Sequence, residues 1–443
     1  MLWRIRSTIS EYPLQFWILF CQRFIGSLGG SLVWPFFTIY LRQRLEIPLT
    51  TVGLLFAISA GVGLFSQAIW GPVVDRYGRK VAMVAGLANE VVIMLGFALL
   101  GSLGAYAVLI AMSGLIEPAS RIGSDAMIAD LIEEEKRPSA YALLRMVSNA
   151  GVALGPAIGG FLAATSYMLT FGSAAVGATI ALLLVVFLVK ETKPELSAAE
   201  KPQRAGGGYR HIFGDVGFIA FCLASILLWM AYEPFMQVLP VYMKEGFGIP
   251  ESGFGLIMTV NALMVVLFQF AVTRVTEKYR DAYVMAAGAL WTGLGALAAI
   301  MANNVWLFLF SMVILTIGEL IWAPTSISFV ARIAPIDMRG RYMGVYGMVN
   351  GIAWGLGPVA NGYVYDNVAP VGVWYLVTIL AAVGTVAFYV IGRVPALSRQ
   401  AKPAPLGIEE EMIPSTVEDL GPTDGELEGA DTQIQQRRAG RDG

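Results

Sequence analysis

Two stretches of this sequence match each other: GVALGPAIGGF at residues 151–161 and AWGLGPVANGY at residues 353–363. Their Gly-Pro pairs begin at Gly155 and Gly357, a shift of 202 residues. The same shift aligns matching residues elsewhere: Tyr40 with Tyr242, Gly53 with Gly255, Gln67 with Gln269, Glu117 with Glu319, and Arg137 with Arg339. Because one constant shift relates so many separate stretches, the sequence predicts two copies of one structural unit.

The composition indicates the solvent in which these copies fold. Hydrophobic residues make up 56% of the 443, charged residues only 14%, and the mean hydropathy is +0.66. A soluble protein of this length would expose large apolar patches, so we expect an all-α integral membrane protein. A net charge of −2 does not favour nucleic acid as a partner. Cys21 and Cys222 lie in apolar runs and His211 stands alone, so we expect no disulfide, metal or cofactor.

The apolar runs predict twelve transmembrane helices, six in each copy. Crossing about 30 Å of hydrocarbon takes roughly 20 helical residues. The runs cover 14–41, 50–74, 81–101, 104–131, 139–164 and 167–189, and then 216–243, 252–276, 282–302, 305–331, 341–364 and 371–392. Because six is even, the copies share one topology. They are expected to form parallel repeats with a substrate site between them near the midplane of the bilayer.

The basic residues predict the orientation. Eighteen fall in segments on one side of the predicted bilayer, and only Arg42, Arg44 and Lys244 fall on the other. Cytoplasmic segments carry the excess of Lys and Arg, so both termini are expected in the cytoplasm. The chain then divides into a cytoplasmic N-terminus (1–13), a first bundle (14–189), a cytoplasmic linker (190–214), a second bundle (215–392) and a disordered cytoplasmic tail (393–443).

The segment after the second predicted helix reads GPVVDRYGRK (71–80). A glycine at 71 allows close helix packing, and one at 78 permits a tight turn. The segment resembles the signature of the major facilitator superfamily, G-x-x-x-D-[RK]-x-G-[RK]-[RK], at every fixed position. The resemblance extends over roughly residues 14–392 and implies a twelve-helix transporter. It also implies that this segment locks the cytoplasmic gate, which assigns gating to Gly71, Asp75, Arg76, Gly78 and Arg79.

The counterpart of this segment in the second copy, TRVTEKYRD (273–281), lacks both glycines, so we expect an asymmetric gate. The fifth predicted helix carries G-x-x-x-G-P-x-x-G-G, in which small residues four apart favour close packing and the proline favours a bend. This pattern resembles the signature of the proton-driven antiporters, with Ala142 where a further glycine is usual. The resemblance adds five residues to the gating set: Gly151, Gly155, Pro156, Gly159 and Gly160.

Ionisable residues fall at lipid depth in several predicted helices. Because a charge there costs roughly 2.5–3.5 kcal/mol on insertion scales, such residues are functional candidates. Four glutamates lie near mid-span: Glu90, Glu117, Glu233 and Glu319. Glu117, Arg121 and Asp125 share one helix face and form either a self-neutralising ladder or a protonation switch. Glu319, in TIGELIWAP, has no adjacent basic residue and is the stronger candidate for a carboxylate that takes a proton or a cation.

The region LIAMSGLIEPASR (109–121) lacks the early arginine that antiporters of the similar branch carry on their fourth helix. Arg121 or Arg145 is therefore assigned to proton coupling together with Glu117, Glu319 and Asp125. The stretch GELIWAPTSISFV (318–330) resembles multidrug exporters whose tenth-helix glutamate faces the drug. Aromatic faces and central carboxylates suit lipophilic cations. The predicted substrate-binding residues are Glu233, Glu319, Trp34, Trp229, Asn149, Trp322, Tyr346 and Trp354.

The sequence therefore predicts a secondary active transporter of the cell (inner) membrane rather than an enzyme. Its leading interpretation is a monomeric, proton-coupled antiporter that exports lipophilic or cationic small molecules by alternating access. Its partners are then a small-molecule substrate, protons and the lipid bilayer. One alternative is proton-coupled transport of a sugar, a metabolite or a lipid. Another is a membrane receptor or scaffold with a transporter fold and no transport. No nucleotide-binding loop or nucleophile–base set is present in the sequence.

Overall fold

The computed structural model describes residues 11–133, 136–193, 209–335 and 338–394. Helices are the only regular elements in these ranges, which confirms the predicted all-α class. Eleven of the described helices are long and apolar enough to cross a membrane. Most of the predicted N-terminus, linker and tail falls outside the described residues.

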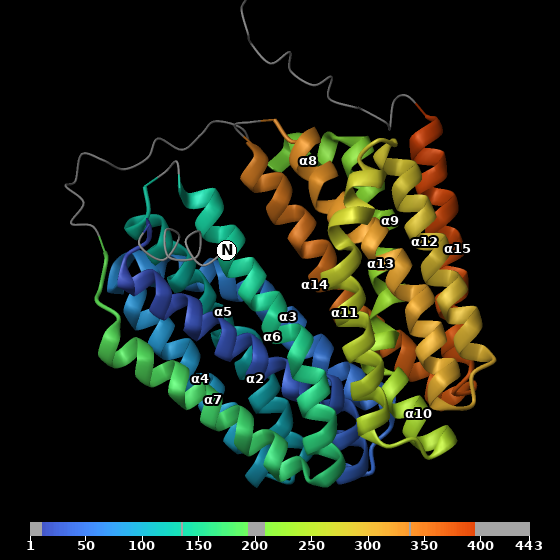
Figure 1. Cartoon of the computed structure of the whole chain (residues 1–443), viewed down its shortest axis with the longest axis horizontal. Helices are drawn as coiled ribbons and strands as arrows, with labels where there is room; N and C mark the ends of the chain where they lie inside the picture. Colours follow the sequence, from blue (N-terminus) through green and yellow to red (C-terminus); the bar gives the residue numbers. More distant parts are fainter. Residues whose placement is uncertain (1–10, 134–135, 194–208, 336–337, 395–443) are drawn as a thin grey trace, which may run out of the picture. The chain divides into compact units, whose positions relative to one another are not determined.

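The helices follow one another in two sets, drawn from blue to green and from yellow-green to red (Figure 1). The first half consists of α2 (Leu14–Leu45), α3 (Leu49–Tyr77), α4 (Arg79–Leu99), α5 (Leu103–Leu131), α6 (Arg137–Thr165) and α7 (Tyr167–Leu188). The second half consists of the short α8 (Tyr209–Gly214), then α9 (Val216–Gln237), α10 (Leu239–Phe247), α11 (Glu251–Thr276), α12 (Asp281–Ile300), α13 (Val305–Ile333), α14 (Arg339–Asn367) and α15 (Gly372–Arg393).

The shift of 202 residues also relates the starts of the helices. The first five helices of the first half begin at residues 14, 49, 79, 103 and 137. Their counterparts α9, α11, α12, α13 and α14 each begin 202 residues later. The two halves are therefore copies in helix placement as well as in sequence, and a residue in one half has a definable counterpart in the other.

The first long helix of the second half departs from this repeat. A single helix is predicted over 216–243, but the structure has two, α9 and α10, which meet at Val238. Pro234 and Pro240 lie on either side of the junction. Proline has no N–H to donate and its ring clashes with the carbonyl four residues earlier, so a helix rarely continues unbroken through two of them. Helix α2, the counterpart of this pair of helices in the first half, contains only Pro35 and is continuous.

Helix α14 differs from the eleven candidate spans in composition. Its 29 residues include seven glycines and three asparagines. It packs against α3 of the first half and α9 of its own half. Since glycine lets a neighbouring backbone approach closely, this composition suits a helix held between other helices.

The halves meet through two equivalent helix pairs, α3 with α14 and α6 with α11. A Cβ atom placed on Gly53 would lie 2.5 Å from the carbonyl oxygen of Pro358. A Cβ on its counterpart Gly255 would lie 2.9 Å from the carbonyl oxygen of Pro156. Both glycines are thus required for direct backbone contact between the halves, and the contact has the symmetry of the repeat.

The glycines of the predicted antiporter signature pack α6 against its neighbours. A Cβ on Gly151, Gly155 or Gly159 would come within 3.0 Å of atoms of α2, the nearest of them in Leu28, Ser31 and Leu32. A Cβ on Gly160 would instead lie 2.8 Å from the carbonyl oxygen of Glu251 in α11. The predicted close packing is therefore present, and three of these four glycines act within the first half. Their role in gating stays a prediction.

Polar contacts join the halves at one end, which we call the closed end. Arg42 of α2 pairs with Glu245 at 2.5 Å and with Asp366 at 3.1 Å. The Asp366 carboxylate also accepts hydrogen bonds from the N–H groups of Leu49 and Thr50, at the first turn of α3. Helix α3 has no side-chain cap of its own, so a residue of the opposite half satisfies its free N–H groups.

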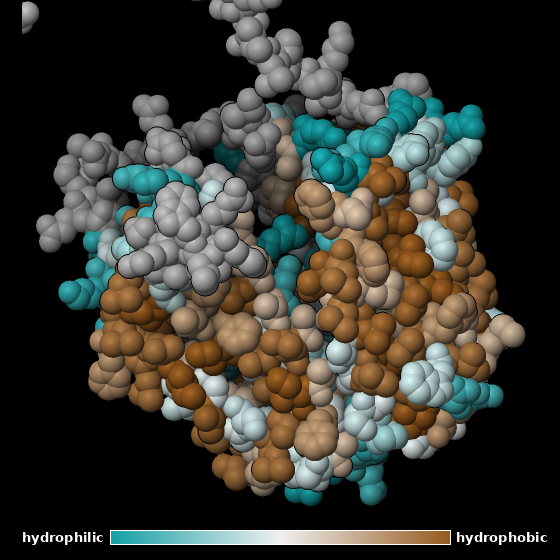
Figure 2. Space-filling view, viewed as in Figure 1, coloured by the Kyte–Doolittle hydropathy of each residue, from teal (hydrophilic) through white to brown (hydrophobic). Residues whose placement is uncertain are grey.

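The halves separate toward the opposite end, which we call the open end (Figure 1). Figure 2 shows a hollow there between two broad apolar surfaces, with hydrophilic residues inside it. The open end carries the ends of α3 and α7 and the starts of α4 and α9.

Candidate functional site

A cavity of about 1430 Å³ lies between the two halves. Its wall is formed by α2, α3, α4, α5 and α6 of the first half and by α9, α11 and α14 of the second. The charged residues among its lining all belong to the first half: Arg23, Glu90, Glu117 and Arg121. Both halves therefore line the cavity, but only the first half contributes charged side chains to its wall.

The deep part of the cavity, toward the closed end, is mostly apolar. Trp34 and Phe56 of the first half lie with their ring centroids 6.0 Å apart. From the second half, Met236, Met258 and Trp354 complete this floor. Methionine and aromatic side chains adapt to flat, apolar ligands and attract cations through the ring faces. Two predicted binding residues, Trp34 and Trp354, are thus placed in the cavity.

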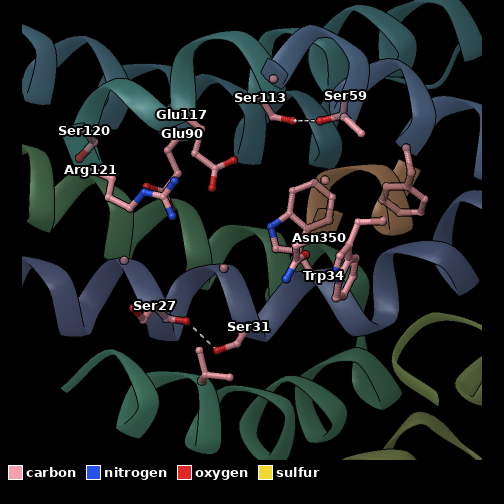
Figure 3. Close-up of a pocket in the computed structure, with 18 of the residues that line it drawn as sticks. Ser27, Ser31, Trp34, Ser59, Glu90, Ser113, Glu117, Ser120, Arg121 and Asn350 are labelled. Carbon is pink, nitrogen blue, oxygen red and sulfur yellow. Dashed lines mark hydrogen bonds between the residues drawn. The ribbon is translucent and has the colours of Figure 1, made fainter. Parts of the chain in front are cut away.

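The middle of the cavity holds Glu117 of α5 and Glu90 of α4 (Figure 3). Their helices are in backbone contact, because a Cβ on Gly86 would lie 2.6 Å from the backbone nitrogen of Ser120. This approach brings two carboxylates from different helices close enough to interact electrostatically. Glu117 is thus placed in the cavity, as the sequence predicts.

The cavity becomes basic toward the open end. Arg121, one turn from Glu117 on α5, is exposed to the cavity and lies beside the two glutamates (Figure 3). Arg23 of α2 forms an ion pair of 2.5 Å with Asp125. Of the three residues predicted as one ladder, Glu117 and Arg121 therefore face the cavity, and Asp125 binds an arginine of another helix. Among the ion pairs of the described residues, none joins Glu117 to Arg121.

Two further predicted residues lie on α6. Arg145 and Asn149 are exposed and share a helix face with Val152 and Pro156, which line the cavity. They lie closer to the open end than the lining itself. The structure thus places them on the approach to the cavity rather than in its wall.

Glu319 does not line the cavity. Its carboxylate accepts a hydrogen bond of 2.9 Å from the side-chain amide of Asn261, and the Tyr232 hydroxyl lies within hydrogen-bonding reach of it. Asn261 also donates to Thr316 at 3.0 Å. The sequence shows that Glu319 has no basic neighbour, but it does not show these neutral partners, which come from α9 and α11.

Tyr232, which reaches Glu319, packs against two tryptophans. Trp229 and Trp322 meet edge to face at 4.7 Å between ring centroids, and Tyr232 lies within 6 Å of both. Neither Trp229 nor Trp322 is among the residues that line the cavity, and the buried Tyr346 is not either. We call Trp229, Tyr232 and Trp322 the aromatic plug. The binding roles predicted for these residues stay predictions, because in this conformation they are packed together.

Glu233 is fully buried behind α14. One carboxylate oxygen accepts a hydrogen bond of 2.9 Å from Asn361, and the other has no hydrogen-bond partner among the described residues. The counterparts of these two residues are Ser31 and Gly159, which pack directly against each other's helices. Asn361 interrupts the glycine pattern in the second half. It donates a hydrogen bond to Glu233, at whose counterpart position the first half has a serine instead of a carboxylate.

The predicted gating segment forms the turn between α3 and α4. Gly78 has φ of 105°, which favours glycine. Arg79 is buried and pairs with Asp130 of α5 at 2.8 Å. Asp75 and Arg76 are exposed, and no ion pair found among the described residues includes Asp75. Gly71 would accommodate a Cβ with nothing within 4 Å.

Glu191, just after α7, is a functional candidate that the sequence did not indicate. Its carboxylate accepts hydrogen bonds of 3.0 Å from the N–H groups of Arg79 and Lys80 and so caps α4. Partial burial raises the pKa of this carboxyl. Backbone N–H donors outweigh that effect and hold the pKa below its ordinary value: those of Arg79, Lys80, Lys193 and Thr192. No sequence pattern links a residue after the sixth helix of a half to the start of the third.

Comparisons with known proteins agree with this fold. The chain matches the sequence profile of the Major Facilitator Superfamily over residues 19–250 and 218–422. It is 27% identical to a Na(+), Li(+), K(+)/H(+) antiporter of Planococcus maritimus over 341 residues, 70% of this chain and 80% of that protein. It is 26% identical to multidrug resistance protein 1 of Bacillus subtilis (strain 168) over 382 residues, 86% of this chain and 96% of that protein.

A crystal structure of the peptide transporter POT in complex with sulfate has the same fold. It superposes with a TM-score of 0.69 at 17% identity, over 88% of this chain and 96% of that one. The family match and the eleven candidate spans identify a multi-pass membrane protein that resembles drug-efflux transporters. The chain belongs to the Major Facilitator Superfamily of membrane transporters.

Proposed function

We propose that this transporter is a proton-coupled antiporter that exports lipophilic or cationic small molecules by alternating access. The observation that carries the proposal is the order of side chains along the cavity. Aromatic and methionine residues form its floor, two carboxylates its middle and arginines its mouth. An apolar body and a positive head would be held by the floor and the carboxylates together. Relatives that include a multidrug resistance protein and a cation/proton antiporter support it.

The orientation forms part of the proposal. The open end carries most of the basic residues, so we place it, both termini and the linker on the cytoplasmic side of the inner membrane. We further propose α14 as a twelfth span, enclosed by α3 and α9. In this arrangement the structure is an inward-facing state of a monomer, ready to receive substrate from the cytoplasm.

The reverse conformation would open the closed end. The contacts of Arg42 and Asp366 across the halves would then break, together with the backbone contacts at Gly53 and Gly255. The gating segment, with its exposed Asp75, would meet the second half and close the cytoplasmic end. Glu319 and Glu233 of the second half are carboxylates with neutral hydrogen-bond partners. They are proposed to take part in proton coupling once this rearrangement gives them access to water.

Transport into inside-out vesicles tests this function. Vesicles with an acidic lumen should accumulate a fluorescent cationic dye, because their lumen corresponds to the cell exterior. Glu117→Gln and Glu319→Gln should each abolish the gradient-driven accumulation. Glu46→Gln, at an exposed position outside the helices, should leave it unchanged.

The outcome also separates the proposal from its rivals. Accumulation that ignores the pH gradient would remove proton coupling from the proposal. Proton movement in the same direction as the substrate would instead indicate symport of a metabolite. A lack of transport across a broad panel of cations and metabolites would favour a receptor or scaffold.

A further inference from the structure

The first half holds a second carboxylate in the cavity, Glu90, which the sequence places at lipid depth but does not single out for proton coupling or substrate binding. It projects from the middle of α4, and Figure 3 shows it beside Glu117. Its counterpart in the second half is Thr292, a buried residue whose hydroxyl donates to the carbonyl of Gly288 in its own helix. The carboxylate pair is therefore specific to the first half.

The charges around this pair leave one negative charge unbalanced. On α5, Arg121 faces the two glutamates, and on α2, Arg23 is neutralised by Asp125 at 2.5 Å. The other helices that pack against α4 contribute no charge at this depth, because α7 has no acidic or basic residue and those of α3 lie at its open end. Glu90, Glu117 and Arg121 thus carry a net charge of −1 when all three are ionised.

A buried net charge of −1 favours the binding of one positive charge. Polar groups without hydrogen-bond partners lie in the same part of the wall. Gln22 and Ser124 line the cavity, are more than nine-tenths buried, and have an oxygen without a partner among the described residues. They offer acceptors to the substituents of a bound head group.

We propose that Glu90 and Glu117 form one binding site for a single monovalent cation, with Glu90 as a residue that determines specificity for positive charge. The site holds one proton in one state and the head of an organic cation in the other. When the organic cation binds, the O–H bond of the protonated carboxyl breaks, the proton leaves through the cavity to water, and an ion pair forms. This inference rests on the proposed function, since it concerns the same cavity.

An organic cation fits this site better than an alkali ion. A hard metal cation is held by several oxygen ligands that enclose it, whereas the surroundings of this pair continue into an apolar floor. A volume of about 1430 Å³ also exceeds what a single ion occupies and suits a bulky aromatic molecule.

The test measures binding rather than transport. Tetraphenylphosphonium, which carries one permanent charge and no titratable group, is titrated into the full-length protein in detergent with weak buffer. We expect about one proton to be released per cation bound, and affinity to fall about tenfold per pH unit on the acidic side, as displacement of one proton requires. Glu90→Gln should lower the affinity at least tenfold and abolish the proton release.

Two controls make the result specific. Glu90→Asp should restore part of the affinity and the proton release, which a merely structural role of the side chain would not predict. A neutral aromatic ligand of similar size should bind Glu90→Gln and the wild type equally well, which shows that the cavity is intact in the variant.

Three outcomes would overturn the inference: wild-type affinity and proton release in Glu90→Gln, release of two protons per cation, or proton release on addition of Na⁺ or Li⁺ with no binding of tetraphenylphosphonium. Failure of the proposed function is a separate result. If binding and proton release behave as expected but vesicles do not accumulate dye, the site stands and export does not. If export is normal and Glu90→Gln binds like the wild type, export stands and the site does not.

Discussion

At the scale of single residues, three exchanges between the halves distinguish the lined cavity from the equivalent packed region. The counterparts of Trp229, Tyr232 and Trp322 in the first half are Ser27, Gly30 and Ser120, which line the cavity. Small side chains leave space beside Glu117, whereas the aromatic plug fills the equivalent space beside Glu319. The two glutamates therefore occupy equivalent positions in the repeat but different environments.

Gly30→Tyr should block the cavity. A Cβ at this position meets nothing closer than 3.7 Å, so the helix accepts a side chain, and the ring must extend into the space that Tyr232 fills in the other half. We expect binding of tetraphenylphosphonium to fall by more than tenfold, measured by titration calorimetry, with little change in the melting temperature. Gly30→Ala is the matched control and should bind normally. Normal binding by Gly30→Tyr would contradict the assignment of this space to the ligand.

Gly159→Ala should destabilise the first half. Its Cβ would lie 2.4 Å from the carbonyl oxygen of Leu32, so α6 must move away from α2, at a cost of roughly 1–3 kcal/mol. A fall in the melting temperature in detergent measures this effect. Gly61→Ala, where a Cβ meets nothing within 4 Å, should be neutral or slightly stabilising. Equal melting temperatures for both variants would show that α6 and α2 are not in close contact.

At the scale of elements, the start of α4 depends on a residue from beyond α7. Glu191 caps α4 by accepting from the N–H groups of Arg79 and Lys80, next to the φ-positive Gly78. The carboxylate replaces the side-chain cap that α4 lacks, since its N-cap residue is the glycine itself. The gating segment and the beginning of the linker are thereby held together.

The Glu191 cap should depend on pH in one direction. Because its pKa is lowered in the folded protein, the ionised carboxylate stabilises the fold fully above the unfolded pKa of about 4.3. That contribution disappears as the pH falls through the lowered pKa. Glu191→Gln should cost roughly 0.5–1 kcal/mol at pH 7, a small effect because the side chain is largely exposed.

Melting temperatures of the wild type and Glu191→Gln, measured from pH 8 down to pH 3, check this expectation. The difference between the two should be constant above about pH 5 and shrink below it. A difference that grows toward acidic pH would mean that Glu191 stabilises the fold in its protonated form.

At the scale of the whole molecule, the closed end is held by bonds that would break under the proposed alternating access. Asp366→Asn should weaken the cap on α3 and the ion pair with Arg42, and so favour opening of that end. A loss of 1–2 kcal/mol changes the ratio of two states by a factor of roughly 5–30. The measurement is labelling of Trp354→Cys on the cavity floor by an impermeant maleimide from outside, after Cys21 and Cys222 are replaced by serine.

Asp281→Asn serves as the matched control for that measurement. Its ion pair with Arg332, at 2.6 Å, lies within the second half and does not join the halves. Labelling in this variant should equal that of the parent protein. Equal labelling in Asp366→Asn would show that the bonds at the closed end do not hold the inward-facing state.

The sequence predicts the repeat well because individual glycines, prolines and charged residues can be aligned between the halves at one constant shift. The matching residues at a shift of 202, among them the Gly-Pro pairs at 155 and 357, predict the repeat, and the starts of five helix pairs confirm the shift. The break at Val238 was not predicted, although Pro234 and Pro240 were visible, because a predicted span takes no account of single prolines.

The candidate site was only partly predictable. Glu117, Arg121 and Trp34 lie where their depth suggests. The surroundings of Glu319 were not predictable, because they depend on which side chains of α9 and α11 fill the space around α13. The depth of a residue in the membrane can be counted along a predicted helix. The side chains that a buried residue contacts depend on how the helices pack, which the sequence does not show.

The aromatic plug has a consequence for the descent of such proteins. If the two halves arose by duplication, they began with the same wall, and the present difference between the lined cavity and the packed aromatic plug includes three positions in each copy. In such a lineage, exchanges of small for aromatic side chains at these positions would change which half offers open space, without altering any helix. Substrate preference in such a lineage would change faster than the architecture that supports it.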